Sequence, residues 1–207
     1  MIRRTRVKIC GIKTPEVAHA TACFGADAIG MVFYNESPRA VNLEQASEIC
    51  KILPPFISKV GLFVDADKNE IDEILNTLSL DLLQFHGSEA PDFCRSFNFP
   101  YIKAVRMQDG VDLQYFVSEY NDARALLLDT HVESKYGGTG KVFDWSMIPL
   151  NPDKPIILAG GLNSGNVKEA IRMIKPYAVD VSGGVESGEG IKDIRKIEQF
   201  IHEVNDA

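Results

Sequence analysis

Short apolar runs rich in β-branched residues alternate with amphipathic stretches along the whole chain. The apolar runs, each about as long as one buried strand, are residues 6–10, 26–33, 58–64, 80–85, 101–105, 125–129, 155–159 and 178–181. Between them, apolar residues recur at spacings of three and four, as on one face of a helix, in residues 16–24, 43–53, 69–78 and 167–174. This alternation predicts parallel βα units and argues against an all-β or all-α domain.

The number of units predicts how the sheet is arranged. The eight strand starts run from about residue 7 to about residue 178, a mean repeat of about 24 residues, close to the minimum for a βα unit. Eight such units close a barrel, and 207 residues lie at the short end of the roughly 200 to 400 that this architecture spans. We therefore predict an α/β fold, a single-domain eight-stranded parallel β/α (TIM) barrel over residues 1–207.

A doubly wound open sheet is the second choice of fold. It would usually have fewer strands at this length and a Gly-x-Gly-x-x-Gly turn after the first strand. Here the first turn reads Cys10-Gly11-Ile12-Lys13, which lacks that pattern.

Composition and charge limit the kinds of partner that the chain can bind. The chain is 45% hydrophobic and 25% charged, as expected for one globular domain, and its formal net charge of −7 argues against a nucleic-acid partner. The apolar stretch after the basic start, residues 1–6, is too short for a signal peptide, and no run approaches the roughly 18 apolar residues of a membrane span. We expect a cytosolic protein, monomer or homodimer, that acts on a small molecule without membrane contact.

The four cysteines form no Cys-x-x-Cys pair, which favours reduced thiols over disulfides or a zinc site. Cys23, Cys50 and Cys94 fall in helical stretches, so we expect them in or near the core. Cys10 ends the first predicted strand and has a different setting.

Polar residues gather at the C-terminal ends of the predicted strands, where β/α barrels hold their active sites. Period-two alternation directs Lys8 and Cys10 into the barrel on the first strand and Asp129 into the mouth on the sixth, while Gln84 and His86 end the fourth. These side chains therefore converge on one mouth.

A buried charge needs a partner. Lys8 and Asp180, on the first and last strands, both face inward by the same alternation. We expect them to contact each other or to share a polar network.

Two glycine pairs follow the seventh and eighth strands, at Gly160-Gly161 and Gly183-Gly184. Glycines let backbone N–H groups approach an anion, and in this fold the loops after strands seven and eight commonly hold a phosphate. The pairs therefore predict a phosphate site. The long loop 130–142 contains three more glycines and is suited to fold over bound substrate and exclude water.

A series of motifs in a fixed order along the chain carries a family resemblance. The motifs are Val7-Lys8-Ile9-Cys10-Gly11-Ile12, Gly25-Ala26-Asp27-Ala28-Ile29-Gly30, Ser37-Pro38-Arg39, Leu83-Gln84-Phe85-His86-Gly87, Leu127-Leu128-Asp129-Thr130, Tyr136-Gly137-Gly138-Thr139-Gly140, Phe143-Asp144-Trp145, Leu158-Ala159-Gly160-Gly161-Leu162-Asn163 and Asp180-Val181-Ser182-Gly183-Gly184-Val185-Glu186. With these motifs the chain resembles phosphoribosylanthranilate isomerase of tryptophan biosynthesis from the first strand to the last helix. One departure is Gly183, where this family usually has a second serine.

The resemblance implies an Amadori rearrangement of an N-aryl phosphoribosylamine, with Cys10 as general base and Asp129 as general acid. It also implies a phosphoribosyl substrate and no cofactor or metal. Arg39 follows the second strand, and because a guanidinium binds a carboxylate in bidentate fashion, we expect it to bind the anthranilate carboxylate. Gln84 and His86 are expected to line the pocket and to hydrogen-bond the opened sugar.

The sequence is also compatible with three other functions. A metal-dependent epimerase acting on a phosphorylated pentose would need clustered ligands, yet of four histidines only His86 ends a predicted strand. The equivalent isomerase of histidine biosynthesis has an aspartate on strands one and five, where this chain has Cys10 and the strand end Val105-Arg106. A non-catalytic phosphosugar-binding domain would keep the fold and the anion site, because fold alone does not decide function.

Overall fold

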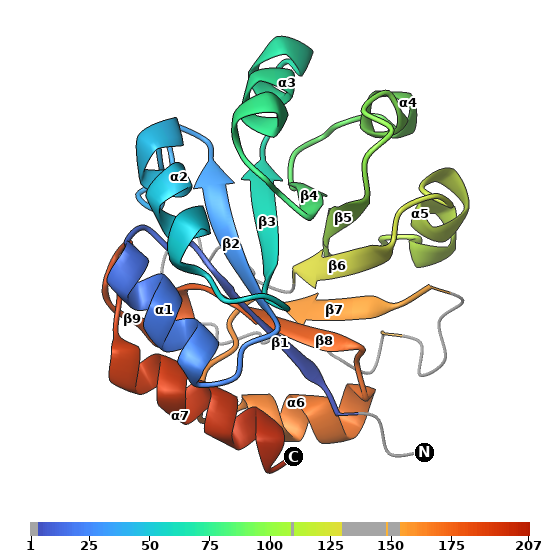
Figure 1. The fold of residues 1–207 in the computed structure, drawn as a ribbon. Helices are drawn as coiled ribbons and strands as arrows, with labels where there is room; N and C mark the ends of the chain where they lie inside the picture. Colours follow the sequence, from blue (N-terminus) through green and yellow to red (C-terminus); the bar gives the residue numbers. More distant parts are fainter. Residues whose placement is uncertain (1–3, 109, 130–147, 149–153) are drawn as a thin grey trace.

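Eight parallel strands close into a barrel with helices around it (Figure 1). The computed structural model describes residues 4–108, 110–129, 148 and 154–207. In the barrel the strands follow in chain order, β1 (Arg6–Cys10), β2 (Ala28–Phe33), β3 (Ser58–Phe63), β4 (Leu82–Phe85), β5 (Tyr101–Arg106), β6 (Ala125–Asp129), β7 (Ile156–Ala159) and β8 (Ala178–Val181), and β8 pairs with β1. The predicted β/α barrel is confirmed, and β1, β6 and β8 have the predicted bounds.

The helices within the described residues are α1 (Pro15–Cys23), α2 (Leu43–Ile52), α3 (Lys68–Thr77), α4 (Pro91–Arg95), α5 (Leu113–Glu119), α6 (Val167–Ile174) and α7 (Ile194–Asn205). After β8 come a 3₁₀ turn, η2 (Gly183–Val185), and a short antiparallel hairpin of β9 (Glu186–Gly188) and β10 (Ile191–Lys192). The predicted loop 130–142 lies outside the described residues.

Polar N-caps explain where several helices begin. Asn42 accepts from the backbone of Gln45, whose side chain accepts in return from the Asn42 N–H, a capping box that starts α2. Asp67 and Asp193 cap α3 and α7 in the same position. The loops therefore end where a side chain can satisfy the first free N–H groups of the next helix.

Two apolar layers separate the inside of the barrel from its outside. Leu126 and Leu128 join the large cluster that includes the buried faces of the helices, whereas Leu127 packs in a cluster made only of strand residues. The same alternation places Val7 and Ile9 outside, while Cys10 packs with Val32 and Leu62. Asp129 therefore follows Leu127 on the inner side, as the alternation predicts.

The cysteine expectations hold only in part. Cys94 is buried and Cys50 is partly buried, but Cys23 is exposed, so its placement in or near the core is wrong. Cys23 is the last residue of α1, beyond the buried face formed by Ala18 and Thr21.

Among the described residues, no helix is long and apolar enough to cross a bilayer.

We predict that Ile49→Ala lowers the free energy of unfolding by about 2–5 kcal/mol, because Ile49 is fully buried in the main apolar core and its loss leaves a cavity. Urea denaturation measures the change. Ile52→Ala, at a 40% exposed position on the same helix, is the control and should cost less than about 1 kcal/mol. Equal losses for the two variants would contradict the assignment of the buried face.

Candidate active site

The strand order brings the predicted site residues to one end of the barrel. Going around the mouth, Asp129 ends β6, Gly160 and Gly161 follow β7, Gly183 and Gly184 follow β8, Cys10 ends β1, and Arg39 follows β2. Because the strands are parallel, all these positions lie at the C-terminal rim. The two glycine loops thus lie between the strand that carries the carboxyl group and the strand that carries the thiol.

Cys10 lies in a nearly closed, charged environment. Only 5% of the surface of Cys10 is exposed to solvent. Lys8, two residues earlier on β1, forms an ion pair of 3.0 Å with Asp180 of β8, and both side chains are buried. The contact expected between Lys8 and Asp180 is confirmed.

Burial raises the pKa of the Cys10 thiol above its ordinary value. The ammonium groups of Lys8 and Lys192 act in the opposite direction because they favour the thiolate, while Asp180 adds to the rise. Cys10 therefore depends on neighbouring cations to reach its charged form.

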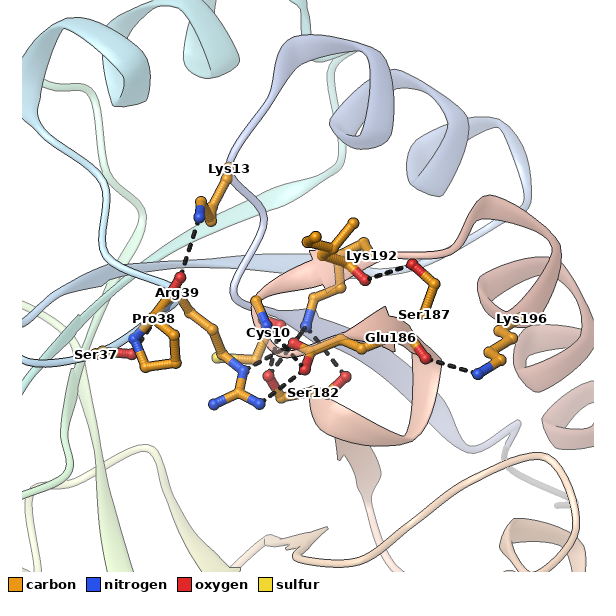
Figure 2. Close-up of polar contacts among 12 residues, drawn as sticks. Cys10, Lys13, Ser37, Pro38, Arg39, Ser182, Glu186, Ser187, Lys192 and Lys196 are labelled. Carbon is orange, nitrogen blue, oxygen red and sulfur yellow. Dashed lines mark hydrogen bonds and ion pairs between the residues drawn. The ribbon is translucent and has the colours of Figure 1, made fainter.

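Arg39 is fixed beside the mouth by Glu186 (Figure 2). Its Nε and Nη2 atoms donate to the two carboxylate oxygens of Glu186 at 2.8 Å each, a bidentate pair between the loop after β2 and β9. Gly11, at φ +80°, leaves room for the aliphatic part of Arg39, since a Cβ there would lie 2.9 Å from its Cδ. The guanidinium is thus held in one place before any ligand arrives.

Glu186 also binds Lys192, which connects the hairpin to β1 (Figure 2). The Lys192 ammonium donates to Glu186 at 2.7 Å and to the backbone and hydroxyl oxygens of Ser182 at 3.1 Å, and the Ser182 hydroxyl donates to the carbonyl of Cys10. Burial alone would raise the pKa of Glu186, but hydrogen bonds from Arg39 and Lys192 lower it to about 2. Burial lowers the pKa of Lys192, against the effect of Glu186.

Sequence reasoning assigned no role to Glu186 or Lys192. Glu186 stands in the motif after β8, but nothing in the spacing shows that Arg39, 147 residues earlier, reaches it. The only signal in the sequence is that an acidic and a basic residue, Glu186 and Lys192, follow shortly after the Gly183-Gly184 pair.

Asp129 contacts His86, which in turn contacts Gln84. The His86 Nε2 atom lies 3.3 Å from Oδ2 of Asp129, and its Nδ1 atom lies 2.8 Å from the amide nitrogen of Gln84. Gln84 is fully buried, and its Oε1 has no hydrogen-bond partner among the described residues. Gln84 therefore supports His86 from inside the barrel, while His86 and Asp129 are partly exposed at the mouth.

A buried ion pair fixes the backbone on both sides of His86. Lys103 of β5 donates to the carbonyls of Phe85 and Gly87 and pairs with Glu89 at 2.9 Å. Glu89 also accepts from the N–H of Gly87. His86 is thereby held at the rim by contacts that do not involve its ring.

The two glycine loops touch each other. A Cβ on Gly184 would lie 1.9 Å from the carbonyl oxygen of Leu162, so only glycine allows this approach. Gly160 and Gly161 have φ of +85° and +66°, a region that favours glycine. A Cβ on Gly183 would make only an ordinary contact, 3.6 Å from Nη2 of Arg39. The loops after β7 and β8 thus form one continuous backbone surface that borders Arg39.

Within the described ranges, no group of three or more His, Cys, Asp or Glu side chains is arranged to hold a metal ion.

Comparisons with known proteins agree with this geometry. Residues 7–203 match the protein family described as N-(5'-phosphoribosyl)anthranilate (PRA) isomerase. A curated relative, the N-(5'-phosphoribosyl)anthranilate isomerase of Pseudomonas savastanoi pv. phaseolicola, is 56% identical over 200 residues, 97% of each chain.

Solved structures extend the likeness to the fold. The phosphoribosyl anthranilate isomerase of Thermotoga maritima is 40% identical with a TM-score of 0.89 and covers 98% of this chain and 100% of its own. A second structure is an isomerase in complex with reduced 1-(o-carboxyphenylamino)-1-deoxyribulose 5-phosphate. It is 37% identical with a TM-score of 0.86, over 98% of this chain and 100% of its own.

We predict that Gly184→Ala lowers the free energy of unfolding by about 1–3 kcal/mol, because the added methyl group overlaps the Leu162 carbonyl and forces the two loops apart. Gly183→Ala is the matched control and should change stability by less than about 0.5 kcal/mol, since its methyl group would lie 3.6 Å or more from every neighbouring atom. Urea denaturation of both variants decides the matter. A destabilisation of Gly183→Ala as large as that of Gly184→Ala would show that the loops are not packed as described.

We also predict a pH-dependent cost for Glu186→Gln, about 1–3 kcal/mol at pH 7. Because the pKa of Glu186 is lowered in the folded protein, its stabilising effect is fully present above the ordinary carboxyl pKa of about 4.3 and is lost as the pH falls toward about 2. The difference between wild type and variant should therefore shrink between pH 5 and the acid limit of folding, measured by urea denaturation at several pH values. A difference that stays constant over this range would argue against the network.

Proposed function

Because this chain belongs to the N-(5'-phosphoribosyl)anthranilate isomerase family of tryptophan biosynthesis, we propose that it catalyses this family's Amadori rearrangement with Cys10 as general base and Asp129 as general acid. The substrate is then N-(5-phosphoribosyl)anthranilate, and the product is 1-(2-carboxyphenylamino)-1-deoxyribulose 5-phosphate. The observation that carries the proposal is the placement of a thiol and a carboxyl group on opposite sides of two touching glycine loops at one barrel mouth.

The reaction needs two proton transfers. The acid donates a proton to the ring oxygen as the furanose C–O bond breaks, and the nitrogen lone pair forms the imine. The base then removes the proton from carbon two, giving an enolamine that tautomerises to the ketose. Each transfer by a positioned side chain contributes about 10²- to 10⁴-fold to the rate.

The charged groups at the rim suit the two anionic ends of this substrate. In our proposal the phosphate binds to the backbone of the Gly160-Gly161 and Gly183-Gly184 loops, aided by the nearby N-terminus of α6. The related structure that holds the reduced product analogue supports this choice of ligand.

Arg39 is the proposed ligand of the anthranilate carboxylate. Glu186 occupies its Nε and Nη2 atoms, while no described residue accepts from Nη1. A guanidinium with one edge already paired keeps its orientation and offers the rest of its fork to a second carboxylate. Its aliphatic part packs against Gly11, the residue after Cys10, so the proposed carboxylate site lies close to Cys10.

His86 and Gln84 complete the proposed site. His86 lies next to Asp129 at the rim, where it orients the acid and is in reach of the opened sugar. Gln84 acts from the buried side by holding the His86 ring. In this scheme the protein groups supply both proton transfers, and no cofactor is required.

The test is turnover of the fluorescent anthranilate-linked substrate. Cys10→Ser and Asp129→Asn should each lower kcat/KM by about 10²- to 10⁴-fold while the circular dichroism spectrum is unchanged. Cys23→Ser, which removes an exposed thiol, is the control and should keep full activity. Wild-type turnover by Cys10→Ser would eliminate the thiol as base, and binding of the substrate by wild type without turnover would favour a binding domain.

A further inference from the structure

The buried pair of Lys8 and Asp180 takes no part in the proposed proton transfers. The two residues are direct partners across the β1–β8 pairing, and their side chains are 5% and 8% exposed. Burying two charges costs desolvation that their attraction only partly offsets, so such a pair is weak evidence of a stabilising role. The neighbourhood of the pair points to another role.

The thiol of Cys10 and the ammonium of Lys8 share one space inside the barrel. Gly30 of β2 is the direct pairing partner of Cys10. A Cβ on Gly30 would lie 2.8 Å from Sγ of Cys10 and 3.1 Å from Nζ of Lys8. The missing side chain at residue 30 therefore lets a cation and a thiol stand together away from solvent.

We propose that Lys8, anchored by Asp180, is a positioning residue for the base: its ammonium holds the negative charge of the Cys10 thiolate. The inference rests on the proposed role of Cys10 as base. The ion pair then has a function. Asp180 holds the Lys8 ammonium in place and limits how strongly this ammonium favours the thiolate.

Three other charged groups near Cys10 also affect the stability of its thiolate. Lys192 of β10 and Arg39 of the loop after β2 also act on Cys10, and both are paired with Glu186 of β9. Lys192 favours the thiolate and Asp180 opposes it. Lys8 and Asp180 therefore act on the thiol with opposite signs, although they belong to one ion pair.

This opposition gives a test that structural damage cannot imitate. The thiolate of Cys10 is titrated by its absorbance near 240 nm, taking for each protein the difference from the same protein carrying Cys10→Ser. Lys8→Met should raise the pKa of Cys10 by about one to three pH units, and Asp180→Asn should lower it, because nearby charges shift a pKa by about this much. Both variants remove half of the same buried pair and should lose thermal stability to a similar extent.

The rate follows the thiolate fraction. At pH 7, Lys8→Met should lower kcat/KM at least about tenfold, since one pH unit changes the thiolate fraction tenfold. The proposal is overturned if Lys8→Met and Asp180→Asn shift the pKa of Cys10 in the same direction, or if neither variant shifts it.

A double variant covers the case in which Lys8→Met does not fold because Asp180 is left unpaired. Lys8→Met/Asp180→Asn carries no unpaired buried charge, and its Cys10 pKa should lie above that of Asp180→Asn alone. If it does not, the proposal fails. The titration is independent of turnover, so a Cys10→Ser variant with full activity would refute the base assignment and leave the result for Lys8 readable.

Discussion

The pairing of β8 with β1 is the contact on which the site depends. It closes the barrel and brings residues near both ends of the sequence into register, with Lys8 opposite Asp180. Beyond the strands, the same closure lets Ser182 reach the backbone of Cys10 and brings the β9–β10 hairpin against the loop after β2. An open sheet with the same strands would leave the thiol without its charged neighbours.

The charge around the Cys10 thiol is opposite in sign to the net charge of the whole molecule. The chain has a net charge of −7, yet Lys8, Arg39 and Lys192 all act on the thiol. Two buried carboxylates, Asp180 and Glu186, keep these cations in place. Such an arrangement gives a local preference for anions in an acidic protein and leaves the thiol with more positive than negative neighbours.

Much of the fold could be predicted from the sequence because it depends on local periodicity. The strands 6–10, 125–129 and 178–181 were recognisable from apolar runs, and alternation along them was enough to pair Lys8 with Asp180. The rim residues Cys10 and Asp129 followed from their places at strand ends.

Other features depend on distances that periodicity does not encode. The reach of Arg39 to Glu186 depends on how a hairpin folds back after β8, and the support of His86 by Lys103 depends on the path of a neighbouring strand. Exposure of Cys23 depends on where α1 ends against its neighbours, not on its being helical. The chemical types at the rim were therefore predictable, and the contacts that hold them were not.

The contact between Gln84 and His86 has a consequence for the imidazole itself. When the amide NH₂ of Gln84 donates to Nδ1, that atom has to supply a lone pair, and a ring with one hydrogen then carries it on Nε2. That hydrogen is directed at the carboxyl group of Asp129. The buried side chain of Gln84 thus determines which tautomer of His86 faces the barrel mouth.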